Sequence, residues 1–272
     1  MDSKVLIITG MHRSGTSLIA EYLSECGLFV GSDLLDLAAS SAVSAYNGHH
    51  EDRDFFELHD QMLKRLHISP FPRYRFRLTN RFSAQEKQLA IALIKAREHL
   101  SRWGWKDPRT ALFLNAWHEV IPEAKHLLLV RNPLSVVDSL IRRGTDKQVV
   151  RHPVVGLRAW RVYNQRILSF LRDQPSSCLL CDIDDLIAHP QTICTLIEKQ
   201  LDLALSPVPF ESVYTQKGFR SGYSDAVNQL KEKHQREVTG ALKLYAELKE
   251  IARDHALEKP ERVSIRKTEV SL

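Results

Sequence analysis

The chain of 272 residues is long enough to bury a sizeable core, as one large α/β domain or two small ones. Its 43% hydrophobic and 26% charged residues are the balance of an ordinary water-soluble globular protein. The net charge of +5 is compatible with an anionic substrate or cofactor, but it is too small and too dispersed to indicate a nucleic-acid partner. No apolar run approaches the roughly 18 residues of a membrane span, and residues 5–8 are too few for the core of a signal peptide. We therefore expect a cytoplasmic protein without an integral membrane segment.

Residues 4–9 form a compact apolar run, rich in β-branched side chains and bounded by Gly10, which is typical of a strand buried on both faces. From Thr16 the apolar residues follow a helical period that ends at Gly27. A strand, a glycine-bounded loop and a helix are the context that a phosphate-binding loop requires. The sequence therefore predicts an anion site close to its start.

The next segments predict two helices separated by a flap. Residues 52–66 have the apolar period of an amphipathic helix, and a capping box of Ser83 and Glu86 opens a helix that we expect to reach about residue 100. Between them, "SPFPRYRFRLTNRF" is interrupted by prolines and rich in arginine, which is typical of a loop or flap.

Buried strands and helices alternate in the rest of the chain. "KHLLLV" and "SCLLCDI" predict two more buried strands. Further helices are expected over residues 112–120, around 136–140, and over 155–172, 190–201 and 224–257. This alternation predicts an α/β fold of three layers, with a mostly parallel central sheet and helices on both faces. We expect a single domain over residues 1–258, followed by a loose tail over 259–272.

Ligands of such sheets bind beyond the carboxyl ends of the strands. Three unusual segments, residues 10–17, 104–109 and 131–139, are expected to meet at that edge.

The four cysteines do not indicate a disulfide framework in a chain of this length. Cys178 and Cys181 have the spacing of half a zinc site, but the sequence holds no second pair. Strand residues three apart also point to opposite faces of a sheet. We therefore expect buried thiols at these positions and no metal site.

The loop "GMHRSGTS" has the glycine spacing of the nucleotide-binding P-loop, and the helix N-terminus behind it attracts phosphate or sulfate. Kinases and NTPases carry a lysine after the second glycine and bind magnesium. Here Thr16 takes the place of that lysine, Arg13 supplies a cation from within the loop, and the strand "LLLVR" ends in Arg131. Because a cation at the strand end repels magnesium and attracts an anion, we expect a ligand with two separated phosphates and no metal. The alternative is a degenerate anion loop without chemistry.

"TGMHRSGTS" followed by "HLLLVRNPLSVVDSLIRR" resembles the sulfotransferases that use 3′-phosphoadenosine 5′-phosphosulfate (PAPS) and release 3′,5′-ADP. The likeness extends from Val5 to about Leu201 and implies a P-loop-like fold. It also implies that the first loop holds the 5′-phosphosulfate, while Arg131 and Ser139 hold the 3′-phosphate. The loop residues assigned to the cofactor in this way are Arg13, Ser14, Gly15, Thr16 and Ser17. "TQKGFRSG" loosely resembles the family's glycine-containing lid, for which Lys217, Gly218 and Arg220 are the candidates.

In sulfuryl transfer, negative charge develops on the departing bridging oxygen, so that positioned cations and N–H donors assist the reaction. Arg13 and the loop amides suit this role. A base must also take the proton of the acceptor. In "NGHHEDRD" the resemblance implies that Glu51 is this base, and His50 is the rival because its unperturbed pKa is nearer neutrality. The alternative is that Glu51 and Asp52 only favour a helix N-terminus electrostatically.

"WGWKDPRT" resembles the "KDP" segment of tyrosylprotein and related sulfotransferases. The resemblance implies that Lys106 steadies the transferring group, and Asp107 would orient either Lys106 or Arg109. The alternative is a surface ion pair on a turn.

The acceptor is expected to be a small molecule or a glycan, with the hydroxyl of a carbohydrate or glycolipid favoured. The basis is the Glu51-type base and the flap, in which arginines alternate with aromatic residues. These are Arg73, Arg75, Arg77 and Arg81, alternating with Phe71, Tyr74, Phe76 and Phe82. A solvent-facing edge strand would show the same pattern. Two other functions compete: a P-loop kinase or NTPase-like enzyme that lacks the lysine, and a non-catalytic nucleotide-binding module.

Overall fold

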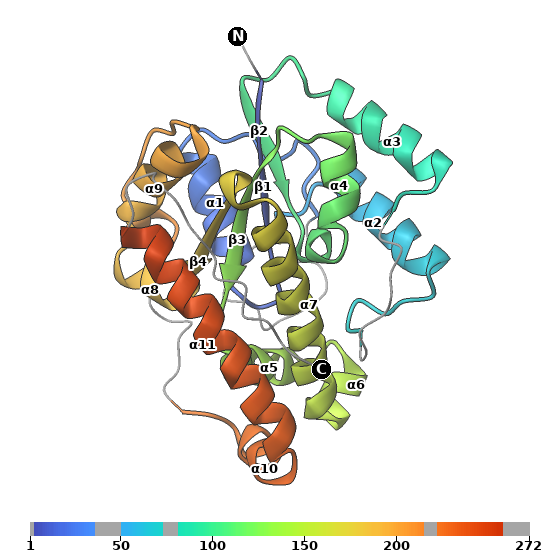
Figure 1. Ribbon diagram of the computed structural model, residues 1–272, viewed down its shortest axis with the longest axis vertical. Coiled ribbons are helices and arrows are strands. Elements are labelled where there is room, and N and C mark those ends of the chain that lie inside the picture. The colour runs from blue at the N-terminus through green and yellow to red at the C-terminus, as the bar shows by residue number, and fades with distance from the viewer. Residues whose placement is uncertain (1–2, 36–49, 73–80, 215–221, 258–272) are drawn as a thin grey trace.

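The computed structural model of the chain describes residues 3–35, 50–72, 81–214 and 222–257. Within these ranges the strands form one parallel sheet in the order β2-β1-β3-β4 (Figure 1). The strands are β1 (Lys4–Gly10), β2 (Arg102–Lys106), β3 (Lys125–Val130) and β4 (Cys178–Asp182). The predicted parallel sheet is thus confirmed.

The sequence predicted β1, β3 and β4 as strands but not β2. This strand has the sequence "RWGWK", which contains no β-branched residue and has a charged residue at each end. Its centre requires glycine, because a Cβ atom added to Gly104 would lie 1.7 Å from the carbonyl oxygen of Leu6 in β1. Close packing against the neighbouring backbone, rather than strand propensity, therefore places β2 in the sheet.

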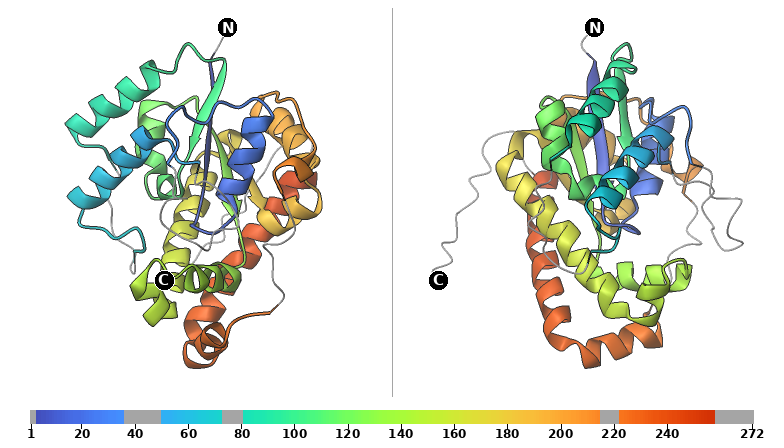
Figure 2. Two further views of the ribbon diagram at one scale, coloured as in Figure 1. Left: turned by 180° about the vertical axis from the view of Figure 1, so that it is seen from behind. Right: turned by 90° about the vertical axis from the view of Figure 1, so that its right-hand side faces the viewer.

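Helices cover both faces of the sheet, which confirms the three layers. Leu6 and Ile8 of β1 pack on one face with the helices α1 (Thr16–Glu25), α8 (Ile183–Ala188) and α9 (Thr192–Leu201). Val5 and Ile7 face the other side, which is covered by α4 (Leu114–Val120), α7 (Pro153–Asp173) and α11 (Gln235–Leu257). α7 and α11 lie in front of the sheet in Figure 1, and α1 lies in front of it in the reverse view of Figure 2. Apolar side chains on both faces are what a buried parallel strand needs.

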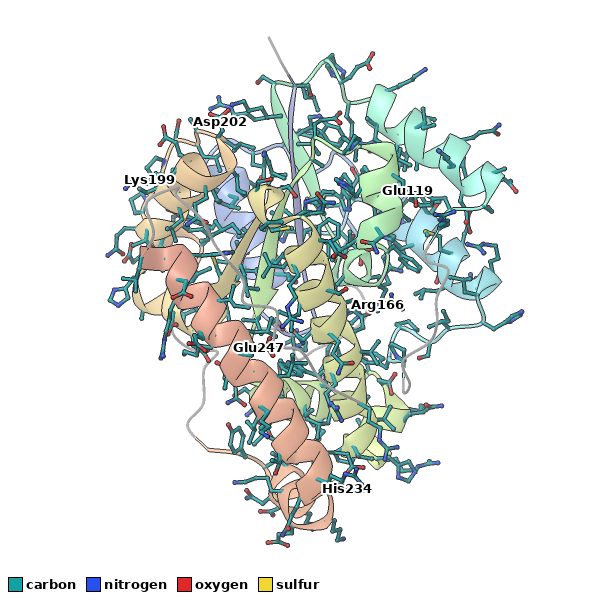
Figure 3. All side chains as sticks on the ribbon, viewed as in Figure 1. Glu119, Arg166, Lys199, Asp202, His234 and Glu247 are labelled. Carbon is teal, nitrogen blue, oxygen red and sulfur yellow. The ribbon has the colours of Figure 1, made fainter. Side chains whose placement is uncertain are left out.

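The remaining helices lie around the edges of the sheet. α2 (Arg53–Arg65) and α3 (Ala84–Lys95) lie on the side of β2, and α5 (Pro133–Arg143), α6 (Lys147–Arg151) and α10 (Asp225–Lys233) lie beyond the carboxyl ends of the strands (Figure 1). The C-terminal α11 crosses α7, and an ion pair between Arg172 and Glu247, the latter labelled in Figure 3, joins the two helices. Helices thus border the carboxyl edge of the sheet.

Two expected helices differ in extent. The capping box of Ser83 and Glu86 is confirmed, but α3 ends at Lys95 instead of near residue 100. The chain turns there, and the guanidinium of Arg97 is buried against the carboxylates of Asp52 and Asp54, at 2.9 and 2.7 Å. The expected helix over residues 224–257 is two helices, because the backbone leaves helical geometry at His234. The short helix α8 was not predicted.

The expectation of buried thiols at Cys178 and Cys181 is confirmed. Cys178 and Cys181 are both buried free thiols in β4, and they belong to the cores on opposite faces of the sheet. Among the described helices, none has both the length and the apolar composition needed to cross a lipid bilayer.

Candidate active site

The loop after β1 has the shape of an anion cradle. It occupies residues 11–15, and its backbone enters the left-handed region at Arg13 (φ 67°) and Gly15 (φ 82°). Turns of this kind direct backbone N–H groups into anion-binding concavities. Gly15 is also required sterically, because an added Cβ would lie 2.4 Å from Cγ1 of Ile183. The end of β1 and the start of α8 thus fix the loop together.

Two observations on this loop fit a phosphate or sulfate group. The hydroxyl of Ser14 is buried, and its Oγ has no hydrogen-bond partner among the described residues, although buried hydroxyls are normally paired. The N-terminus of α1 follows Gly15, which has no side chain with which to cap it, and the first turn contains no acidic residue. An anionic oxygen at this place would accept from the hydroxyl and from the helix N-terminus.

The strand-end arginine lies against the same loop. Arg131 follows β3, and its Nη1 donates to the carbonyl oxygen of Arg13 at 3.2 Å. Its own carbonyl accepts from Nε1 of Trp160 at 3.0 Å, and its Nε lies 3.9 Å from Oδ1 of Asp184. Burial lowers the pKa of Arg131, and the nearby Asp184 opposes this effect. Arg131 is therefore a largely buried cation at the carboxyl edge.

Ser139 completes this side of the site. Asn132 caps α5 through its side-chain oxygen, which accepts from the amides of Leu134 and Ser135, and Ser139 lies on the same helix. The Oγ of Ser139 accepts from Nε of Arg13 at 2.9 Å. The structure thus brings together Arg13, Arg131 and Ser139.

The lysine of "WGWKDPRT" is buried and paired. Lys106 ends β2 with no exposed surface, and its Nζ donates to Oε1 of Glu51 at 2.6 Å and to Oγ of Ser17 at 3.1 Å. The alternative interpretation of this segment as a surface ion pair is therefore wrong. Glu51 is only 7% exposed, so burial raises its pKa, and burial lowers the pKa of Lys106. The charge of each partner opposes the effect of burial on the pKa of the other.

The three polar residues that precede α2, His50, Glu51 and Asp52, lie in different surroundings. Asp52 is the N-cap of α2, and its side chain accepts from the amide of Asp54, as expected. Glu51 forms the buried ion pair with Lys106, so its role is not limited to an electrostatic effect on the helix N-terminus. Burial lowers the pKa of His50 to about 4, and the charge of Lys106 adds to this effect. His50 is therefore neutral near pH 7.

Asp107 orients Arg109 rather than Lys106. Its carboxylate accepts from Nη2 and Nε of Arg109 and from the backbone N–H of Arg109, at 2.6–3.2 Å. The guanidinium lies over the ring of Phe56, 3.7 Å from its centroid. Arg109 and its neighbours hold the pKa of Asp107 far below its usual range, although burial acts in the opposite direction.

A buried histidine supports Asp107, and sequence reasoning missed it. Nδ1 of His59 lies 2.8 Å from Oδ2 of Asp107, and Nε1 of Trp117 donates to Nε2 of His59 at 2.8 Å. Since the indole N–H only donates, His59 carries its proton on Nδ1 and donates it to Asp107. This bond joins α2, which begins next to Glu51, to the end of β2, which carries Lys106. The signal in the sequence was a polar residue on the apolar face of a predicted helix.

A group of rings near the loop was also missed. His12 lies against Phe71, with ring centroids 5.1 Å apart, and against Tyr163, whose hydroxyl oxygen is 3.4 Å from Nε2 of His12. The hydroxyl of Tyr163 donates to the carbonyl oxygen of Pro70 at 2.9 Å. Burial lowers the pKa of His12 to about 3, so its ring is neutral. These rings attach the start of the flap to the loop and to α7.

Several candidates lie outside the described residues. They are Lys217, Gly218 and Arg220 and the flap residues Arg73, Tyr74, Arg75, Phe76 and Arg77. Arg81 of the flap is described and lies 3.3 Å from Glu119. In the part of the chain that the structure covers, no three His, Cys, Asp or Glu side chains converge as metal ligands would.

Comparison with known proteins gives one consistent family. The model of a family described as the sulfotransferase family matches residues 6–207 of this chain. Comparison with the curated proteins gives no match.

Solved structures show the same fold at low sequence identity. A sulfotransferase from Mycobacterium avium superposes with a TM-score of 0.57 at 16% identity, over 92% of this chain and 77% of the other. The sulfotransferase domain of the Synechococcus PCC 7002 olefin synthase gives 0.51 at 17% identity, over 90% and 94%. A sulfotransferase from Alicyclobacillus acidocaldarius gives 0.50 at 14% identity, over 92% and 97%.

Proposed function

We propose that this chain, which belongs to the sulfotransferase family, transfers a sulfuryl group from PAPS to an acceptor hydroxyl without a metal ion, and that carbohydrate or glycolipid acceptors are favoured. Bound PAPS would supply the activated sulfuryl group and leave 3′,5′-ADP as the product.

In this proposal, the loop after β1 binds one end of the donor, and residues that follow β3 bind the other end. The amides of residues 13–17 and the hydroxyls of Ser14 and Thr16 would bind the 5′-phosphosulfate, which is supported by the buried hydroxyl of Ser14. Arg131 and Ser139 would bind the 3′-phosphate. Arg13 donates to Ser139, and Arg131 donates to Arg13, so that the two anion sites are linked through the protein. This linkage keeps the cations in place before the ligand binds.

Glu51 and Lys106 have different roles in the proposed reaction. Glu51 would accept the proton of the acceptor hydroxyl, and burial, which raises the pKa of this carboxyl, makes it a stronger base than an exposed carboxylate. Lys106 would donate to the oxygens where negative charge develops, and it holds Glu51 at 2.6 Å. Burial lowers the pKa of His50 to about 4, which makes its ring a weaker base than an ordinary histidine, so we assign the base to Glu51.

One observation carries the proposal: the buried Lys106 contacts Glu51 and, at the same time, the hydroxyl of Ser17 in the first turn of α1, directly after the anion loop. A base, a cation and the anion loop are thereby joined at the carboxyl edge, where ligands of such sheets bind.

The direct test incubates the protein with radiolabelled PAPS and panels of glycans, phenols and peptides in excess EDTA. We expect label on a glycan. Glu51→Gln should reduce kcat by roughly 10²–10⁴-fold, the usual contribution of a general base, and should leave 3′,5′-ADP affinity unchanged. The control is Glu57→Gln, which changes an exposed glutamate on the outer face of α2 and should keep full activity.

Other outcomes have definite meanings. Full activity of Glu51→Gln together with an inactive His50→Ala would assign the base to His50. Binding of 3′,5′-ADP without transfer to any acceptor would indicate a non-catalytic module. Binding of ATP only with magnesium would indicate the kinase alternative.

A further inference from the structure

We propose that the carboxylate of Asp184 weakens the hold of Arg131 on the 3′-phosphate of the nucleotide, so that 3′,5′-ADP leaves the site faster than it would without this charge. The role of Asp184 rests on the proposed function, in which Arg131 binds that phosphate. Asp184 lies in the first turn of α8, which follows β4 at the carboxyl edge of the sheet.

Arg131 and Asp184 form an ion pair at this edge. Nε of Arg131 lies 3.9 Å from Oδ1 of Asp184, which is longer than a hydrogen bond, so charge rather than a directed bond links the two groups. Another nitrogen of the same guanidinium, Nη1, donates to the carbonyl oxygen of Arg13 in the anion loop. Asp184 thus places a negative charge beside the guanidinium without orienting it through a hydrogen bond.

The carboxylates on either side of Asp184 have a different cationic partner. Asp182 caps α8, and Nζ of Lys249 lies 3.8 Å from its Oδ1. The same Nζ lies 3.1 Å from Oδ1 of Asp185, since α11, which carries Lys249, passes beside α8 (Figure 1). Among the described residues, no cation other than Arg131 lies within ion-pair distance of Asp184. Arg131 is therefore the nearest counter-charge of Asp184.

The start of α8 is anchored from two sides. Ile183 packs against Gly15 of the anion loop, where an added Cβ would lie 2.4 Å from Cγ1 of Ile183. On the other side, the hydroxyl of Tyr245 in α11 donates to Oδ2 of Asp182 at 2.6 Å. The backbone at Asp184 is therefore fixed between the loop and α11.

A phosphate on Arg131 would meet the field of this carboxylate. A phosphate oxygen that accepts from any N–H of the guanidinium, at the usual length of about 3 Å, lies within roughly 9 Å of Asp184. This separation is about one Debye length, so the repulsion between the phosphate and the carboxylate is only partly screened. In the empty site, Asp184 also attracts the cation that the phosphate needs. Both effects lower the affinity for the 3′-phosphate.

Partial burial sets the size of the effect. Burial lowers the pKa of Arg131, and the charge of Asp184 opposes this shift. Burial likewise raises the pKa of Asp184, and the charge of Arg131 opposes that shift. Charges that are partly removed from water interact more strongly than fully exposed ones. The Asp184 side chain is still 44% exposed, so we expect a change of a few-fold rather than of orders of magnitude.

A weaker hold on the 3′-phosphate matters for the product. 3′,5′-ADP keeps both phosphate positions of the donor, so the cations that bind the donor also retain the product. Product release limits turnover in many enzymes. A fixed carboxylate beside Arg131 shortens the time for which the product stays bound, and it lowers the affinity for the donor by the same interaction.

The test compares two nucleotides that differ only in the 3′-phosphate, 3′,5′-ADP and 5′-AMP. Their affinities are measured by calorimetry in excess EDTA, and the dissociation rate of 3′,5′-ADP is measured by stopped flow. The variants are Asp184→Asn, Asp184→Glu, which keeps the charge, and Asp185→Asn. Asp185→Asn is the matched control, because it removes the same charge one residue further along α8, where the partner is Lys249. Arg131→Ala, with and without Asp184→Asn, shows whether the effect passes through Arg131.

We expect Asp184→Asn to bind 3′,5′-ADP at least about threefold more tightly than wild type and to release it correspondingly more slowly. Its affinity for 5′-AMP should equal that of wild type. Asp184→Glu should stay closer to wild type than to Asp184→Asn, and Asp185→Asn should change either affinity by less than about twofold.

An unchanged or weaker affinity of Asp184→Asn for 3′,5′-ADP would overturn the proposal. An equal gain for 5′-AMP, an equal gain in Asp185→Asn, or a gain that persists in the Arg131→Ala background would each do the same. The wild-type protein gives a separate readout for the proposed function. Equal wild-type affinities for the two nucleotides would contradict the binding of the 3′-phosphate by Arg131, whereas a preference for 3′,5′-ADP that Asp184→Asn leaves unchanged contradicts the role of Asp184 alone.

Discussion

Replacing His59 by Phe tests the buried network beneath Lys106. The substitution keeps an aromatic ring at a fully buried position but removes both nitrogens. Asp107 then loses the bond from Nδ1, and Nε1 of Trp117 loses its acceptor, each at 2.8 Å in the wild type. Asp107 keeps its bonds to Arg109, so the ion pair at the end of β2 remains.

The magnitude follows from these two losses. A hydrogen bond to a charged carboxylate contributes roughly 1.5–3 kcal/mol, and a buried N–H without a partner costs about 1–3 kcal/mol. We therefore expect His59→Phe to lower the free energy of unfolding by roughly 3–5 kcal/mol. At about 2 °C per kcal/mol for a domain of this size, the melting temperature should fall by roughly 6–10 °C.

Urea denaturation and a thermal melt at pH 7 measure the effect. The matched control is His99→Phe, which makes the same replacement at an exposed position and should change stability by less than about 0.5 kcal/mol. If His59→Phe is no less stable than this control, the assignment of the Trp117–His59–Asp107 chain is refuted.

Three further predictions concern the loop, Lys106 and the pH dependence of stability. Gly15→Ala should weaken 3′,5′-ADP binding at least about tenfold, because Gly15 has a positive φ and an added Cβ would collide with Ile183. Adding Ile183→Ala to this variant should restore only part of the affinity, because the strain of the positive φ remains. A normal affinity of Gly15→Ala in calorimetry would contradict this prediction. Lys106→Met removes the charge that lowers the pKa of Glu51, so the acid limb of the pH profile of kcat/KM should move to higher pH, and an unchanged limb would exclude Glu51 as its source. Burial lowers the pKa of His126 to about 3, so below pH 6.5 the unfolded chain binds a proton that the native chain does not. Between pH 7 and 5 the free energy of unfolding should therefore fall by about 2 kcal/mol more in wild type than in His126→Phe, and parallel urea-denaturation results would contradict this.

The main features of the fold could be predicted from local patterns. β1, β3 and β4 are apolar on both faces, and alternation with helices is sufficient to predict a parallel sheet. β2 was missed because its place depends on contact between Gly104 and the backbone of β1, which is separated from it by nearly one hundred residues. Propensity within a short window carries no information on such a contact.

The site was predicted to the extent that its residues occur in recognisable segments. Arg13 comes from one segment and Arg131 and Ser139 come from another, and they meet in the structure because both segments follow the carboxyl ends of parallel strands. The burial of Lys106 could not be predicted, since the partner that makes burial tolerable, Glu51, is distant in the sequence. His59 was missed for the same reason: its role appears only once α2 lies beside β2.

Calorimetry of 3′,5′-ADP in excess EDTA tests the central claim most directly, because the claim is that protein cations alone hold both phosphates. We predict that one nucleotide binds per chain, and that Arg131→Ala weakens this binding at least about tenfold. Binding that appears only after a divalent ion is added, or an affinity that Arg131→Ala leaves unchanged, would contradict the account.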